Sequence, residues 1–153
     1  MTQPIYRALA DCFCAEGVST LFALLGDGNM HWATDMAERL GVRMIHVRHE
    51  HNALCGAMGH WSATGEVGVA SVTCGPGFTQ IVTALTSAVR GRVPLVVFAG
   101  ETPLGARYYH QEFDQQPVAR LCGAHYMAAH SPKRMHQYVR EAFYTARHKN
   151  IPV

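Results

Sequence analysis

The sequence has no long hydrophobic run, no block of like charges and no leader-like start. No stretch approaches the roughly 18 apolar residues of a membrane span. The first seven residues lack the basic and apolar regions of a signal peptide. The formal charge of +2, with no Lys/Arg cluster, argues against a dedicated nucleic-acid surface. We therefore expect a cytoplasmic protein with no nucleic-acid and no membrane partner.

A disulfide framework and a metal motif are also missing. Five cysteines is an odd number, and their spacing matches no framework, so we expect reduced thiols. Cys12 and Cys14 lie two residues apart in a predicted helix, as do His49 and His51, so their side chains point apart. No spacing fits structural zinc. We expect no metal bound by this chain alone.

The composition is that of a globular domain. The chain has 153 residues, 48% hydrophobic and 16% charged, which is enough for one domain with a sizeable core. Periodicity, caps and apolar runs predict alternating helices and strands. This alternation predicts an α/β fold, with a parallel sheet of about five to six strands and helices on both faces. Helices are predicted at 4–16, 30–40, 50–63 and 77–90, with a last helix capped by Ser131, starting at Pro132 and running through 146. Strands are predicted at 20–25, 42–47, 67–72, 94–99 and, weakly, 124–128.

The remaining segments are loops and an apparent strand start. Residues 100–117 are predicted to be irregular, and residues 150–153 read as the start of a further strand. Ligands in parallel α/β folds bind beyond the carboxyl ends of the strands. Gly26, Glu50 and the turn Gly75-Pro76-Gly77 all follow predicted strands. An acid beside a glycine-lined turn suits a flat polar ring. The alternatives are a surface acid favoured by the helix dipole and an ordinary strand-to-helix turn.

Several motifs occur together and in order. They are H-E at 49–50, Gly59, A-T-G at 63–65, T-C-G-P-G at 73–77, P-L-V-V-F-A-G-E-T-P at 94–103 and H-Q-E-F-D at 110–114. In this combination they resemble the N-terminal pyrimidine-binding domain of thiamine-diphosphate enzymes, in the branch of acetolactate synthase, pyruvate oxidase and benzaldehyde lyase. The resemblance covers nearly the whole chain.

The resemblance implies a role for each motif. In the family, the acid at the position of Glu50 is catalytic: it hydrogen-bonds N1′ of the cofactor's aminopyrimidine and helps the amino group take the proton from C2. A desolvated acid suits this role. Gly75, Pro76 and Gly77 would line the ring, and Thr73 and Gln80 are candidate ring contacts. His31 and Gln111 are candidates for the substrate side, and each reads equally well as a solvated loop residue.

Some positions depart from the family pattern. Gln80 replaces the usual Asn, Phe78 replaces a small residue, and His60-Trp61-Ser62 replaces Y-A-R. The turn Gly26-Asp27-Gly28, with Asn52 downstream, is similar to the motif that holds Mg²⁺ and the diphosphate. That motif lies on the family's other domain, and Asn52 falls in the Glu50 helix, so we reject the match.

The resemblance implies thiamine diphosphate chemistry that makes or breaks carbon–carbon bonds of 2-oxo acids or related carbonyl compounds. Residues 1–153 would be a single domain, an N-terminal fragment or one subunit of a larger enzyme. A diphosphate-binding domain, of the same enzyme or of a partner subunit, would hold Mg²⁺. A homodimer or homotetramer is expected. FAD would need a further domain and is not indicated.

Two other functions stay open. A degenerate, non-catalytic module for assembly or regulation would explain the departures at His60, Trp61 and Ser62, whereas the intact Glu50 argues against it. A generic α/β nucleotide-binding domain is disfavoured because the sequence contains no phosphate-binding loop of the Walker type.

Overall fold

A parallel sheet forms the centre of the computed structural model, which describes residues 3–103 and 105–153. Within these residues the sheet has four strands in the order β2-β1-β3-β4. They are β1 (Thr20–Ala23), β2 (Arg43–His46), β3 (Gly68–Val72) and β4 (Leu95–Ala99). All neighbours pair in parallel, and β3 and β4 pair along their whole length. The predicted α/β class is confirmed, whereas the predicted count of five to six strands is too high.

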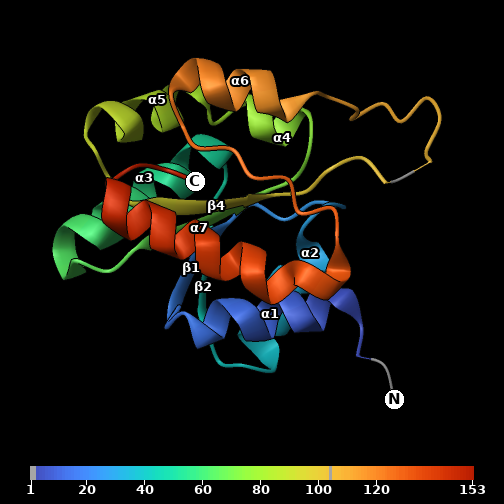
Figure 1. Cartoon of the computed structure of the whole chain (residues 1–153), viewed down its shortest axis with the longest axis horizontal. Coiled ribbons are helices and arrows are strands. Elements are labelled where there is room, and N and C mark those ends of the chain that lie inside the picture. The colour runs from blue at the N-terminus through green and yellow to red at the C-terminus, as the bar shows by residue number, and fades with distance from the viewer. Residues whose placement is uncertain (1–2, 104) are drawn as a thin grey trace.

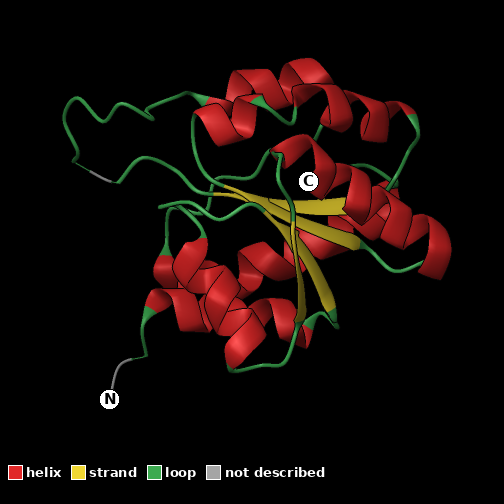
Figure 2. Cartoon of the chain, turned by 180° about the vertical axis from the view of Figure 1, so that it is seen from behind, coloured by secondary structure: helices red, strands yellow, loops and turns green. Residues whose placement is uncertain are grey.

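Helices cover both faces of this sheet (Figures 1 and 2). Contacts join α1, α2 and α7 on one side, whereas α3, α5 and α6 pack together on the other. The predicted covering of both faces is thus confirmed. The helices are α1 (Ile5–Ala15), α2 (Met30–Glu38), α3 (Glu50–Thr64), α4 (Pro76–Thr79), α5 (Val82–Arg90), α6 (Gln115–Cys122) and α7 (Met135–Lys149), with a 3₁₀ turn at Pro132–Arg134.

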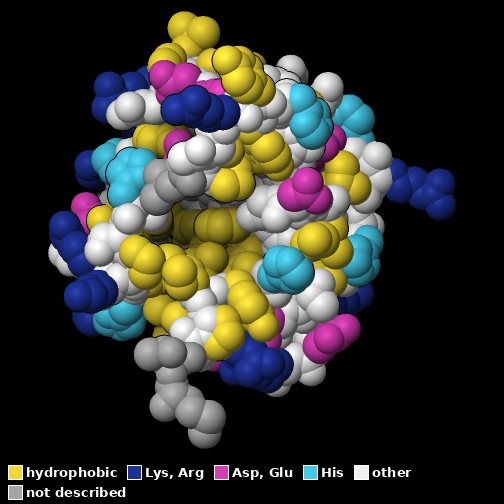
Figure 3. All heavy atoms as spheres, turned by 90° about the vertical axis from the view of Figure 1, so that its right-hand side faces the viewer, with side chains coloured by type: hydrophobic (Ala, Val, Ile, Leu, Met, Phe, Trp, Pro, Cys, Tyr) yellow, Lys and Arg dark blue, Asp and Glu magenta, His cyan; other side chains and the backbone are white. Residues whose placement is uncertain are grey.

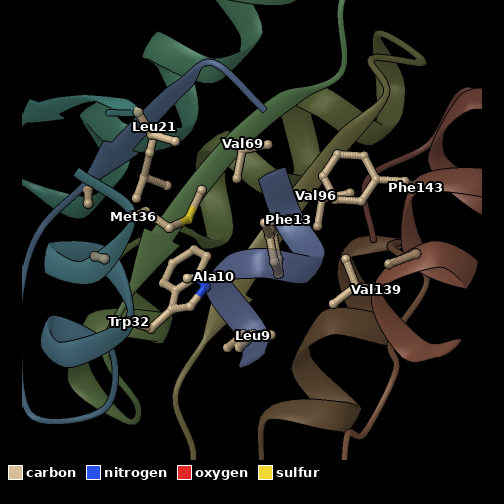
Figure 4. Close-up of a cluster of buried hydrophobic side chains, with 14 of the residues drawn as sticks. Leu9, Ala10, Phe13, Leu21, Trp32, Met36, Val69, Val96, Val139 and Phe143 are labelled. Carbon is tan, nitrogen blue, oxygen red and sulfur yellow. The ribbon is translucent and has the colours of Figure 1, made fainter. Parts of the chain in front are cut away.

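The two faces bury separate hydrophobic cores. Successive strand residues point to opposite faces, so Val96 belongs to the core under α1, α2 and α7, and its neighbour Leu95 to the other. In the first core, Phe13 meets Trp32 and Phe143 in edge-to-face contacts with ring centroids 4.9 and 5.5 Å apart (Figure 4). Near-continuous apolar strands are therefore explained by burial on both faces.

The predicted weak strand at 124–128 is wrong. The position beside β4 is taken instead by Pro152 and Val153, as the strand-like reading of 150–153 anticipated. Pro152 forms an isolated parallel bridge with Leu95, and the Val97 N–H donates to the Val153 carbonyl over 2.8 Å. His125 donates its N–H to the Pro152 carbonyl over 2.9 Å, so the segment 124–128 lies one position further out.

The helix predicted at 77–90 is two helices. The Ile81 N–H bonds the Phe78 carbonyl, three residues back, instead of the residue four back, so the chain tightens between α4 and α5. Phe78 and Ile81 are both buried in the second core, which lies under α3, α5 and α6.

The irregular segment predicted at 100–117 runs into a helix that the sequence reading missed. Asp114 caps α6 by accepting the Gln116 N–H, and Gly123, at φ 85°, ends it. Asp before the first turn, Pro117 within it and Gly after the end were the available signals. Among the described residues, no helix is long and apolar enough to cross a membrane.

Candidate functional site

Glu50 begins α3, shortly after the end of β2. His49 caps the helix: its ring Nδ1 accepts the His51 N–H over 3.1 Å. A carboxylate in the first helical turn faces unpaired N–H groups and the positive end of the helix dipole. Glu50 is half-buried, so its carboxyl group is still reachable from outside this chain.

Gly77 lies against this carboxyl group. A Cβ placed on Gly77 would lie 3.6 Å from Glu50 Oε1 and 2.7 Å from Thr73 Cγ2. A methyl group on Gly77 would therefore overlap Thr73, so only glycine lets the turn approach the acid this closely. Because β2 and β3 both lead into this region, the structure brings Glu50 and the Gly-Pro-Gly turn together as expected from the strand ends.

Gly75 allows the loop that carries Gln111 to pack closely on the turn. Its φ is 59° with ψ −112°, a backbone conformation that residues with a side chain rarely adopt. A Cβ at Gly75 would overlap the main-chain carbonyl of Gln111. Gly75 thus allows the loop before α6 to pack on the turn, and Pro76 occupies the first position of α4. In the described structure, Gly77 rather than Gly75 faces Glu50.

Thr73 joins this turn to the loop after β1. Its Oγ1 accepts the Gly28 N–H over 3.2 Å. A Cβ on Gly26 would lie 2.8 Å from Thr73 Cβ, so only glycine allows the loop to approach. The hydroxyl group of Thr73 is therefore already engaged within the chain. We define the Glu50 site as Glu50, Thr73, Gly75, Pro76 and Gly77.

A buried polar link supports the same loop, and the sequence reading missed it. Asn29 is 2% exposed. Its Oδ1 accepts the Gly26 N–H over 2.8 Å, and its Nδ2 donates to Ser71 Oγ over 2.9 Å. Burial leaves these groups no water, so the bonds hold the β1–α2 loop against β3. The available signal was the Asn at the end of the Gly-Asp-Gly-Asn turn.

Gln111 is brought to the Gly-Pro-Gly turn by side-chain bonds as well as by its backbone. Its Oε1 accepts from the Cys74 thiol over 3.4 Å and from the Tyr109 hydroxyl over 3.2 Å. No sequence signal marked Cys74 or Tyr109, because the loop that carries Tyr109 has no periodicity. Gln111 itself was among the predicted substrate-side residues.

The other two candidates make no hydrogen bond to Glu50 among the described residues. Gln80 is exposed at the end of α4. His31 is exposed in the first turn of α2, with its ring centroid 5.9 Å from that of Tyr6. No contact joins either side chain to Glu50 among the described residues. Their proposed roles stay predictions.

A large cavity lies away from the Glu50 site. It has a volume of about 580 Å³ and lies between α1, α7, β4 and residues 124–129. Its walls are mostly apolar, and Figure 3 shows a recess floored by hydrophobic side chains. His31 lines this cavity, whereas none of the residues of the Glu50 site does. Among the residues that the structure describes, no group of three or more His, Cys, Asp and Glu could hold a metal ion.

Comparison with known proteins decides the family. Residues 4–118 match the family model described as thiamine pyrophosphate enzyme, N-terminal TPP binding domain. The chain belongs to this family. The half-buried Glu50 acid beside the Gly-Pro-Gly turn can hydrogen-bond a ring nitrogen, so the residues present agree with the family's cofactor.

Individual relatives are much longer than this chain. The chain is 40% identical over 117 residues to 2-hydroxyacyl-CoA lyase 2 of Xenopus laevis, covering 74% of this chain and 18% of that protein. It is 34% identical over 124 residues to the protein of the same name from Danio rerio, covering 77% and 20%. It is 32% identical over 131 residues to the acetolactate synthase isozyme 2 large subunit of Escherichia coli K12, covering 84% and 24%. The chain thus spans about a fifth of the length of these relatives.

Proposed function

We propose that the Glu50 site binds the aminopyrimidine ring of thiamine diphosphate, with the Glu50 carboxyl group hydrogen-bonded to N1′. The observation that carries this proposal is the close approach of the Gly77 backbone to the Glu50 carboxyl group. In a member of this family, that pairing provides the acid and, next to it, a turn residue without a side chain. Gly75 and Pro76 set the turn, and Gln80 remains a proposed further ring contact.

The residues of this chain act on the ring by position and charge. The N-terminus of α3 holds the Glu50 carboxylate, and the carboxyl group holds a proton at N1′. Thr73, bonded to the Gly28 N–H, keeps the wall behind Gly77 in place. When bound, thiamine diphosphate supplies the nucleophilic carbon and accepts the electrons of the broken carbon–carbon bond. Because Glu50 is half-buried, water must be excluded from it by surface outside the described residues.

The substrate class we propose is a 2-oxo acid or a related carbonyl compound, whose carbon–carbon bond is cleaved or formed in an acetolactate synthase-like reaction. The names of the relatives support this class: one group are acetolactate synthases and another are 2-hydroxyacyl-CoA lyases. His31 and Gln111 stay the proposed substrate-side residues.

We further propose that this domain works together with a diphosphate-binding domain, in the same enzyme or in a partner subunit, that holds Mg²⁺. Relatives about four times as long as this chain support this arrangement. Assembly into a homodimer or homotetramer is part of the same proposal. The five cysteines, all free, support the proposal of a reducing, cytoplasmic compartment.

The substitutions at His60, Trp61 and Ser62 do not favour a degenerate module. They lie near the far end of α3, about 15 Å from Glu50 at 1.5 Å per helical residue. The His60 ring packs near Phe22, with centroids 6.2 Å apart, and Trp61 joins the second core. The fold accommodates these side chains without any change at the Glu50 end.

The proposal is tested by proton exchange at C2 of thiamine diphosphate. The chain is supplied with the diphosphate-binding portion of its enzyme and Mg²⁺, and exchange is followed by NMR. We expect Glu50→Gln to slow exchange by about 100-fold or more, the usual range for losing an acid–base group. The matched control is Glu66→Gln, an exposed carboxyl group after the other end of α3, which should leave exchange unchanged. Equal exchange in Glu50→Gln and the native chain would refute the role of Glu50.

A further inference from the structure

A chain of buried hydrogen bonds runs from β4 through β3 to the loop after β1. Its two side chains are Ser71, which is fully buried, and Asn29, which is 2% exposed. The Ser71 hydroxyl donates to the Phe98 carbonyl over 3.0 Å and accepts from Asn29 Nδ2 over 2.9 Å. Nδ2 also donates to the Leu24 carbonyl over 3.1 Å, and Asn29 Oδ1 accepts the Gly26 N–H over 2.8 Å. Two side chains thus join three segments of the chain.

The donors and acceptors of this chain of bonds fit together in only one way. The Phe98 carbonyl can only accept, so the single proton of the Ser71 hydroxyl is given to it. Ser71 therefore has to accept from Asn29, and an amide donates only through its NH₂ group. A flipped amide would set its oxygen against the Leu24 carbonyl and its NH₂ group against the Gly26 N–H. The orientation of Asn29 is therefore fixed by its partners.

The loop that these bonds hold is in direct contact with the Glu50 site. A Cβ on Gly26 would lie 2.8 Å from Thr73 Cβ, and the Gly28 N–H donates to Thr73 Oγ1 over 3.2 Å. On its other side, Gly28 packs on the residue after β4, since a Cβ on Gly28 would lie 3.0 Å from Gly100 Cα. The loop is therefore closely packed between Thr73 and the end of β4.

Thr73 extends this contact to the acid. Its Cγ2 lies 2.7 Å from the position that a Cβ on Gly77 would take, and that position is 3.6 Å from Glu50 Oε1. Close-packed groups of this kind cannot move independently. A displacement of the loop therefore displaces Thr73, and with Thr73 the turn residue beside the carboxyl group.

We infer that Asn29 and Ser71 are positioning residues for the Glu50 site. They fix the loop after β1, and through Thr73 they set the position of Gly77 relative to the Glu50 carboxyl group. Neither side chain hydrogen-bonds Glu50 within residues 3–103 and 105–153, so they act through other residues. The effect on the cofactor rests on the proposed function, whereas the link from Ser71 to the loop and the turn is a property of this chain.

The link is tested with two substitutions of equal shape. Ser71→Thr keeps the hydroxyl group, whereas Ser71→Val replaces it by a methyl group, so any crowding is common to both. Loss of the hydroxyl group leaves the Phe98 carbonyl and one N–H of Asn29 unpaired in the interior. In NMR spectra of the ¹⁵N-labelled chain, we expect the Gly28 and Gly77 amide signals to shift in Ser71→Val and to stay near their native positions in Ser71→Thr.

A reference amide separates this local effect from a general change. The Leu85 N–H is bonded to the Ile81 carbonyl over 2.8 Å in the second core, and its signal should stay in place in both variants. Native Gly28 and Gly77 signals in Ser71→Val would overturn the link. A shift at Gly28 without one at Gly77 would show that the link ends at the loop, and the positioning role would fall.

The effect on the cofactor is tested by proton exchange at C2 of thiamine diphosphate in the assembled enzyme with Mg²⁺. Saturating cofactor and a rate per folded molecule remove differences in affinity and stability. We expect exchange to be at least about tenfold slower in Ser71→Val than in Ser71→Thr, as for one lost hydrogen bond, because misplaced groups slow the step. Ser87→Val, the same change at an exposed serine of α5, is the matched control and should keep the native rate.

The two failures are distinguishable. If the native assembly shows no cofactor-dependent C2 exchange, the proposed function fails and the positioning role falls with it, while the amide spectra still decide the link. If the native assembly exchanges and the two Ser71 variants exchange equally fast, the proposed function stands and only the positioning role is refuted.

Discussion

The Glu50 site and the large cavity beside β4 are built in opposite ways. At the site, glycines allow direct contact between chain segments: Gly75 against Gln111, Gly26 against Thr73 and Gly77 against Glu50. The cavity has about 580 Å³ of space between mostly apolar walls. Size alone would have placed the function in the cavity. Close approach of backbone, which only glycine permits, marks the site instead, because a bound ring also needs bare backbone.

This comparison predicts that an added methyl group harms the site and spares the cavity. The largest effect is expected for Gly75→Ala. The substitution combines a strained backbone conformation with overlap on the Gln111 carbonyl, and we expect about 3 kcal/mol of lost stability. Urea unfolding measures this loss. The control is Gly59→Ala, where a Cβ meets nothing within 4 Å in α3, and a gain of up to about 1 kcal/mol is expected.

Gly77→Ala should separate binding from stability. The new methyl group presses on a Thr73 methyl group, which can turn, so we expect only about 1–2 kcal/mol of lost stability. It also lies 3.6 Å from Glu50 Oε1, so affinity for thiamine diphosphate in the assembled enzyme should fall by at least about tenfold. Calorimetric titration measures the affinity. Native affinity in a folded Gly77→Ala protein would show that the ring lies elsewhere.

The cavity wall should tolerate a larger side chain. Ala124 lines it, and we expect Ala124→Val to change stability by no more than about 0.5 kcal/mol. The matched comparison is Ala57→Val. Ala57 is fully buried in α3, with Gly68 against its carbonyl, so overpacking there should cost about 1–3 kcal/mol. Equal losses of unfolding free energy in the two variants, measured by urea unfolding, would show that the cavity wall is packed as closely as α3.

The smallest effect is expected for the pH dependence of stability, through an ion pair between α1 and α2. Hydrogen bonds from Gln3 and Arg39 lower the pKa of Asp11, and Arg39 also bonds Asp35, which joins α1 to α2. A carboxyl group with a lowered folded pKa adds stability above its unfolded value, near 3.8, and this contribution is lost as the pH falls through the folded pKa.

Asp11→Asn should therefore lower the urea midpoint slightly at pH 7 and leave it unchanged well below pH 3. Glu38→Gln, at the end of α2, is the control and should follow the native pH profile. A native pH profile in Asp11→Asn would mean that this ion pair contributes nothing to stability.

Much of the fold could be predicted because its signals are local. The four strands and most helices follow from apolar runs, caps and glycines. The errors have long-range causes. Residues 124–128 are no strand because Pro152 and Val153 already occupy the place beside β4. The helix α6 was missed although Asp114 and Gly123 bound it, since it lies within an otherwise unpatterned segment.

Some residues around Glu50 could likewise be predicted from local sequence, whereas the contacts of others are seen only in the structure. The family, the acid and the Gly-Pro-Gly turn were readable because each depends on residues close in sequence. His31 could be placed after a strand, but only the structure puts it on the cavity wall. The partnership of Cys74, Tyr109 and Gln111 was invisible, because hydrogen bonds between a strand end and a distant loop leave no period in the sequence.

The sequence by itself determined the four strands, most of the helices, the family and the position of Glu50 at a helix start. These follow from backbone preferences and hydrophobic periodicity, which act over a few residues. Only the tertiary structure decided which glycine faces the acid, what holds Gln111 and where the large cavity lies. Those features depend on contacts between segments that the sheet brings together. The distances between these segments are set by packing rather than by local backbone preference.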